Sequence, residues 1–140
     1  MGLGTVLDDF VEEKMLNLNT CFIGKVESVK AGKAKVQPLT MFKTYGGEAK
    51  QPAVVEDVPI CNNVYKIELY EWEQMPPEGD HPPHKHEGHV RLVPVQAGDI
   101  VVCVCADRDI SETQNGSMAL PSLGHHDISN AIIVGLLSDW

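Results

Sequence analysis

Four of the six histidines in this 140-residue chain fall between positions 81 and 89, in the segment HPPHKHEGH. Imidazole nitrogens bind zinc, iron, nickel and copper. His84 and His86 form the clearest pair, because residues i and i+2 of an extended backbone project to the same side, with Cα atoms about 6 to 7 Å apart. The prolines before them stiffen the segment and reduce the entropy lost on binding. The segment therefore predicts a metal site on His84 and His86, with secondary candidates at His81, Glu87 and His89.

Two imidazoles from one chain do not complete a coordination sphere. Within one chain, a secondary candidate would have to complete a tetrahedral zinc site, with one ion per chain. Around a threefold axis, three chains that each donate His84 and His86 supply six nitrogens, an octahedral set suited to iron, with one ion per three chains. A solvated polar loop is the plainer interpretation. For His125 and His126, hydrogen bonding or capping is expected instead of metal ligation.

The rest of the sequence excludes several functional classes. The net charge is −9, and without a basic cluster to displace counterions from phosphates no nucleic-acid partner is expected. Nucleophile-elbow, phosphate-loop and His-Glu-x-x-His motifs are absent, so we expect no enzyme. No apolar run reaches the roughly 18 residues of a membrane span, and the N-terminus lacks a signal peptide, so synthesis in a cytoplasm is expected. The cysteines are expected to be reduced, with Cys103 and Cys105 as small core hydrophobes.

The hydrophobic pattern predicts one helix and several short strands. Apolar residues at i, i+3, i+4 spacing predict a helix from Thr5 to Leu18, with Thr5 as its N-cap, packed as a lid on a barrel or on a neighbouring subunit. Loops are expected at 44–51 and in the proline-rich segment 75–83. The predicted strand regions are 22–29, 34–39, 54–60, 64–72, 89–95 and 100–105, with a last apolar element at 128–137. Strands this short and numerous favour a small β-barrel.

An ordered set of stretches resembles the N-terminal OB-fold domain of the central-spike proteins of contractile phage tails, which puncture membranes. The matching stretches are LNTCFIGKV (18–26), KVQP (35–38), VP (58–59), VPVQAGDIVV (93–102), DRDI (107–110) and HDISNAI (126–132). Together they span most of residues 18–135 in the order found in the family. The resemblance implies a mainly β chain: a small OB-fold-like barrel with a short N-terminal helix.

In that family the domain forms a homotrimer beneath the tail hub and carries a β-helical needle, whose apex often holds an iron ion bound by a His-x-His from each chain. His84-Lys85-His86 matches this tip motif, but it lies within the chain and not in a C-terminal needle. The resemblance therefore implies a helix at 1–19, an OB-fold-like domain at 20–63 and 90–140, and an inserted β-hairpin at 64–89 that forms the tip. The residues expected at the trimer interface are Tyr65, Ile67 and Leu69 on one face and Tyr70 and Trp72 on the other.

The function implied is structural. The chain would be a baseplate protein of a virion or tail-like particle, made in the host cytoplasm. It would contact the tail hub and be driven through the target cell envelope on contraction. Three chains would share one iron ion, with zinc as the alternative metal.

Two other classes remain open from the sequence. A cupin, a small β-barrel metalloprotein or enzyme, would place His84, His86 and His126 with a carboxylate on one ion inside the barrel. Against this, Glu87 follows His86 directly, whereas the cupin glutamate comes several residues later. A structural OB adaptor without metal would be held in a complex by its edge strands and its N-terminal helix.

Overall fold

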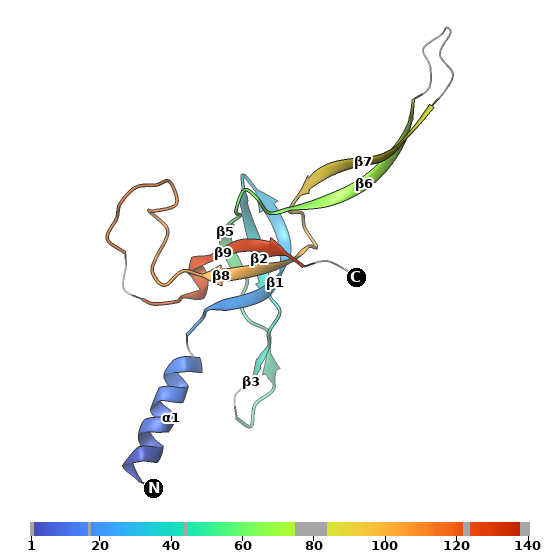
Figure 1. The fold of residues 1–140 in the computed structure, drawn as a ribbon. Helices are drawn as coiled ribbons and strands as arrows, with labels where there is room; N and C mark the ends of the chain where they lie inside the picture. Colours follow the sequence, from blue (N-terminus) through green and yellow to red (C-terminus); the bar gives the residue numbers. More distant parts are fainter. Residues whose placement is uncertain (1, 17, 44, 75–83, 122–123, 138–140) are drawn as a thin grey trace.

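The computed structural model describes residues 2–16, 18–43, 45–74, 84–121 and 124–137; for residues 70–74 and 84–88 it describes the backbone alone. The chain is mainly β, with one N-terminal helix, a curled antiparallel sheet and a long hairpin that leaves the sheet (Figure 1). This confirms the predicted class of a mainly β chain with a small barrel-like sheet. Among the described helices, none is long and apolar enough to cross a membrane.

Five strands form the curled sheet, in the spatial order β5-β2-β1-β8-β9. Each hydrogen-bonded pair of neighbours is antiparallel. The two edges meet at one point, because Ile60 and Ile133 form a parallel bridge and the Cys61 N–H donates to the Ile133 carbonyl at 3.1 Å. The strands are β1 (Cys21–Lys30), β2 (Lys33–Pro38), β5 (Val55–Pro59), β8 (Ile100–Cys105) and β9 (Ala131–Leu136).

The core lies inside the curl and consists of small and branched apolar side chains. Alternate residues of β1, β8 and β9 face inward, as the period of a β-strand requires, whereas β2 and β5 depart from strict alternation. The most completely buried are Val26, Val36, Val58, Val101, Cys103 and Ile133. Cys105 is also buried, so the prediction that Cys103 and Cys105 are core residues is confirmed.

Helix α1 (Leu3–Leu16) exists as predicted, but its bounds and packing differ from the prediction. The Val6 N–H donates to the Gly2 carbonyl, so the helix begins before Thr5, and the predicted Thr5 cap is wrong. None of its residues is buried, and it extends away from the sheet (Figure 1). The expectation that it covers its own barrel is therefore wrong, because its apolar face is exposed and is not covered by the part of the chain that the structure describes.

Two smaller elements complete the barrel region. The expected loop at 44–51 is flanked and partly formed by a two-residue ladder, β3 (Phe42–Lys43) with β4 (Ala49–Lys50). A 3-10 turn, η1 (Ile128–Asn130), leads into β9. Its N-cap is Asp127, whose Oδ1 accepts hydrogen bonds from the Ser129 N–H and hydroxyl, both at 2.9 Å. These hydrogen bonds lower the pKa of the Asp127 carboxyl.

Candidate functional site

The candidate site is the hairpin of β6 (Tyr65–Gln74) and β7 (His84–Pro94), here called the ribbon. The two strands pair with each other in a separate two-stranded sheet, and the ribbon projects away from the barrel (Figure 1). β7 begins at His84, several residues earlier than the predicted strand at 89–95. His84 and His86 therefore lie on extended backbone, as the metal-site prediction requires.

The base of the ribbon is held by charged side chains. Lys66 Nζ lies 2.8 Å from Asp99 Oδ1, and the Asp99 side chain is only 14% exposed. The other Asp99 oxygen accepts the Gln96 N–H at 2.8 Å, within the turn that joins β7 to β8. That turn is itself bound to β1, since the Gly98 N–H donates to the Val26 carbonyl. The ribbon is thus fixed to the barrel where it leaves it.

One face of the ribbon near its base is apolar and exposed. Ile67 and Leu69 are 66% and 77% exposed, and alternate residues of a strand share a face. Their cross-strand partners are Leu92 and Val90, which are also exposed. The face, here called the ribbon apolar face, consists of Tyr65, Ile67, Leu69, Val90 and Leu92. Three of the five residues predicted at a trimer interface, Tyr65, Ile67 and Leu69, belong to it.

The opposite register face carries charges near the base and histidines farther out. Glu68 pairs across the strands with Arg91, and Arg91 Nη2 lies 2.8 Å from Glu68 Oε2. Farther along β6, Tyr70 and Trp72 occupy the same register face as Glu68. The two remaining predicted interface residues thus lie on the other face from Tyr65, Ile67 and Leu69, as alternation along the strand predicts.

A β-bulge sets the register of the histidines. Trp72 pairs with His86 and Gln74 with His84, whereas Tyr70 pairs with His89. Between the Tyr70–His89 and Trp72–His86 pairs β7 spans three residues while β6 spans two, so β7 contains one extra residue at Glu87–Gly88. Without the bulge, His89 would alternate to the face opposite His86. The pairing instead gives the three histidines the register positions of one face, opposite Gln74, Trp72 and Tyr70.

The remaining metal candidates are only partly described. His81 lies outside the described residues, and Glu87 sits at the bulge. Elsewhere in the described part of the chain, no group of three or more His, Cys, Asp or Glu residues is arranged to hold a metal ion. The bulge itself was missed at the sequence level, although Gly88 beside Glu87 is a residue typical of bulges.

His126 lies in a different place from the ribbon histidines. Its N–H donates to the Asp107 carbonyl and its carbonyl accepts from Asn19, beside the start of β1. Its Nδ1 is buried and makes no hydrogen bond within the described part of the chain. In Figure 1 the turn that holds η1 and the outer part of the ribbon lie on different sides of the barrel. The structure therefore does not bring His126 beside His84 and His86, which a cupin site would need.

The two buried cysteines, Cys103 and Cys105, have weakly reactive thiols. Burial raises the pKa of the Cys103 thiol to about 12, with smaller contributions from Cys105 and Cys21. Burial also raises the pKa of Cys105. Both thiols are therefore protonated at neutral pH, and a thiol is neither a strong nucleophile nor a good metal ligand in that form.

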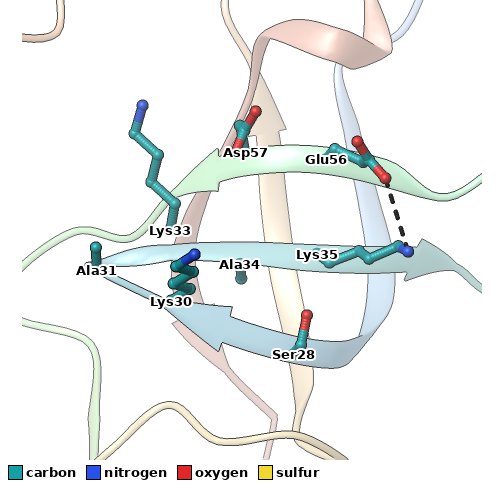
Figure 2. A pocket seen from close by; sticks show the side chains of 8 residues that line it. All are labelled: Ser28, Lys30, Ala31, Lys33, Ala34, Lys35, Glu56 and Asp57. Carbon is teal, nitrogen blue, oxygen red and sulfur yellow. Dashed lines mark ion pairs between the residues drawn. The ribbon is translucent and has the colours of Figure 1, made fainter.

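The outer surface of β1, β2 and β5 carries an open hollow of about 430 Å³ (Figure 2). Its charged side chains are Lys30, Lys33, Lys35, Glu56 and Asp57. Lys35 Nζ lies 3.6 Å from Glu56 Oε1, and both side chains are well exposed. Mixed charges around an open hollow do not form a phosphate site. They do show that lysines gather on this side of the barrel, which the sequence analysis overlooked.

Comparison with models of known protein families gives no match for this chain, and comparison with curated proteins gives none either.

Proposed function

We propose that this chain is a structural central-spike protein of a contractile phage tail or tail-like particle, trimeric and capped by a metal ion at the ribbon tip. The observation that carries the proposal is the ribbon register, which assigns His84, His86 and His89 to one face at the outer part of a projecting hairpin. An anchored element that projects from the barrel and carries histidines suits a mechanical role better than an enzymatic one.

The strand connections support an OB fold for the barrel. β1 is central and pairs with β2 and β8, β2 pairs with β5, and β8 pairs with β9. The parallel bridge between Ile60 and Ile133 brings the two edges together. The OB fold is a five-stranded, partly open barrel, so a curled five-strand sheet with these connections supports that assignment. In an OB-fold spike, the ribbon is an insertion between its third and fourth strands, β5 and β8.

A threefold axis accounts for the ligand count. Each chain offers a His-x-His on extended backbone, which alone gives two ligands. Three chains supply six imidazoles, which suits an octahedral iron site, with zinc as the alternative. His89 has the same register face but lies on the barrel side of the bulge. It would be near the axis where the three ribbons come together.

The ribbon apolar face would bury between neighbouring chains above the metal. It lies on the register face opposite the histidines, and a two-stranded ribbon twists strongly along its length. The twist lets the base and the tip of one ribbon present opposite register faces to the same axis. Tyr70 and Trp72, between the ribbon apolar face and the outer histidines, would complete the interface between chains.

Contraction would then drive the trimer into the target cell envelope without bond chemistry. The tail hub would bind the barrel end, since the ribbon must point outward. The metal would tie together three tips that are otherwise separate, so the free energy of metal binding would add to the stability of the assembly.

The test is metal content and mass of the purified protein. We expect a trimer with about one iron ion per three chains. His84→Ala with His86→Ala should remove the metal and leave the barrel folded, whereas the matched removal of an exposed histidine, His125→Ala, should leave the metal in place. Full metal occupancy in the double variant would contradict the proposal.

A cupin-like metalloprotein is the second candidate, favoured only by the unpartnered buried Nδ1 of His126. It predicts one metal per chain in a monomer or dimer, and loss of that metal in His126→Ala. The spike predicts unchanged metal in the same variant. A metal-free protein that keeps a stable complex with a hub would instead indicate the structural adaptor.

A further inference from the structure

Helix α1 presents an apolar face that no described residue of its own chain covers. Its apolar residues recur at i, i+3 and i+4, the spacing of one helix face. Each of them is between 51% and 75% exposed, and the face, here called the helix apolar face, consists of Leu3, Val6, Leu7, Phe10, Val11 and Met15. Contiguous apolar exposure of this kind marks an interaction site.

The chain is bonded to the barrel shortly after α1 ends. The Asn19 N–H donates to the His126 carbonyl at 3.3 Å, and the Thr20 carbonyl accepts from Cys105 at 2.9 Å. Leu18 is bonded back to Met15, which ends the helix. In Figure 1 α1 extends away from its own sheet, so a second molecule is the natural occupant of its apolar face.

The same chain has a second uncovered apolar surface, on the outside of the sheet. The register aligns Cys21, Val104 and Ile132 in one row across β1, β8 and β9, and Ile23 with Val102 in the next. Cys21 and Val104 are exposed, and the others are partly exposed. With Val134, these six residues form the outer apolar face. The outer side of an antiparallel sheet is normally polar, so an apolar one indicates that it is covered.

The two surfaces are also complementary in charge. Within α1, four carboxylates stand against one lysine, Lys14, and Asp8 and Glu12 border the helix apolar face beside Val11 and Met15. The barrel segment 21–50 carries six lysines against two glutamates, in a chain whose net charge is −9. Lys25 follows Ile23 on the same outer side of β1. The acidic helix can thus meet Lys25 at the border of the outer apolar face.

We propose that α1 of one copy packs its apolar face on the outer apolar face of a second copy, with its carboxylates toward the lysines of segment 21–50. Each chain then gives one helix and receives one, a head-to-tail contact that closes into a ring. The number of copies in the ring, three, rests on the proposed function; the contact itself does not. A membrane surface is a poorer occupant, because anionic lipids repel the acids of α1.

Disulfide trapping between two differently tagged copies tests the contact. Both copies carry Cys21→Ser, one also carries Phe10→Cys and the other Val104→Cys. After mixing and mild oxidation we expect a disulfide between the two tags. The control replaces Phe10→Cys with Asp9→Cys, which lies on the polar side of α1 and should give at least about tenfold less product. Equal trapping by the two, or none, would overturn the proposal.

Sedimentation measures the association of two variants at exposed residues and separates this contact from the spike assembly. Val104→Lys should raise the dissociation constant of the oligomer at least about tenfold, with an unchanged circular dichroism spectrum. Met118→Lys, in the exposed loop between β8 and η1, should not change it. Unchanged association of Val104→Lys in a metal-bearing trimer would reject the helix contact and leave the spike intact. Trapped α1 contacts in a protein without metal would reject the spike tip and keep the contact.

Discussion

Gly24, in the middle of β1, sits where two strands approach most closely. A Cβ added there would collide with Val36 Cγ1 and lie 3.3 Å from the Gln37 carbonyl oxygen. Val36 is fully buried and packed in the core, so it has little room to move aside. The close approach of β1 and β2 therefore depends on the missing side chain.

We predict that Gly24→Ala lowers the free energy of unfolding by about 1 to 3 kcal/mol, the usual cost of overpacking a core. Gly135→Ala is the matched control, because β9 leaves nothing within 4 Å of an added Cβ. That variant should change stability by less than about 0.5 kcal/mol. Urea unfolding of both variants measures the difference, and equal stability would show that the collision is relieved without cost.

The sequence could predict some of these residues and not others. Cys103 and Cys105 alternate within the apolar run of 100–105, and that pattern alone predicted that they are buried. Gly24 lies in a strand pattern that any small residue would fit, so the need for glycine becomes visible only when β2 is placed against β1. A local pattern reports which face a residue takes, but not the distance to the opposing strand.

At the scale of elements, the ribbon depends on the bonds at its base. Asp99 joins three segments, since its two oxygens bind Lys66 of β6 and the Gln96 N–H, and its own carbonyl accepts from Val26 of β1. Its side chain is mostly buried, so solvent screens these contacts less than those of a surface pair.

We predict that Asp99→Ala lowers the free energy of unfolding by about 1 to 2 kcal/mol and increases amide exchange in β6 and β7. The more exposed pair offers a control: Glu68→Ala removes the bond to Arg91 and should cost less than about 1 kcal/mol. Hydrogen exchange followed by mass spectrometry would show the effect segment by segment. Equal exchange in the two variants would mean that Asp99 does not hold the ribbon.

The sequence predicted which helices and strands exist better than it predicted how they pack. The hydrophobic period predicted α1 and four of the five strands of the curled sheet, with bounds shifted by a few residues. It gave an apolar element of unspecified type at 128–137, where β9 lies. It could not predict that α1 leaves the barrel, because an apolar helix face indicates that a partner surface exists but not whether that surface belongs to the same chain. Nor could it place His89 with His84 and His86, since plain alternation puts His89 on the other face.

At the scale of the whole molecule, the uncovered apolar surfaces lie on three separate parts: α1, the outer side of the sheet and the ribbon. A single copy leaves all three in water, which is costly at about 25 cal/mol for each Å². The proposed ring and the proposed spike each cover a different part. The assembled particle would therefore be held at both ends, by helices at one and by metal-tied ribbons at the other.

We predict that metal removal weakens the assembly without unfolding the barrel. A strong chelator should lower the midpoint of thermal unfolding by at least about 5 °C at a fixed protein concentration, because a ligand bound only by the native assembly stabilises it. The His84→Ala, His86→Ala variant should start at the lower midpoint and not respond to chelator. A wild-type midpoint that is insensitive to chelator would show that the metal, if bound, contributes no stability.

Because of the bulge at Glu87–Gly88, the number of residues in β7 decides which face of the ribbon each histidine takes. Deleting the single residue Gly88 removes no ligand, yet it would restore plain alternation and move His89 out of step with His84 and His86. Adding residues in matched pairs to β6 and β7 beyond the bulge would keep the histidines in phase and lengthen the ribbon by about 7 Å for each two residues per strand. The length of such a ribbon could therefore change only by two residues per strand at a time, because side chains alternate between the two faces of a β-strand.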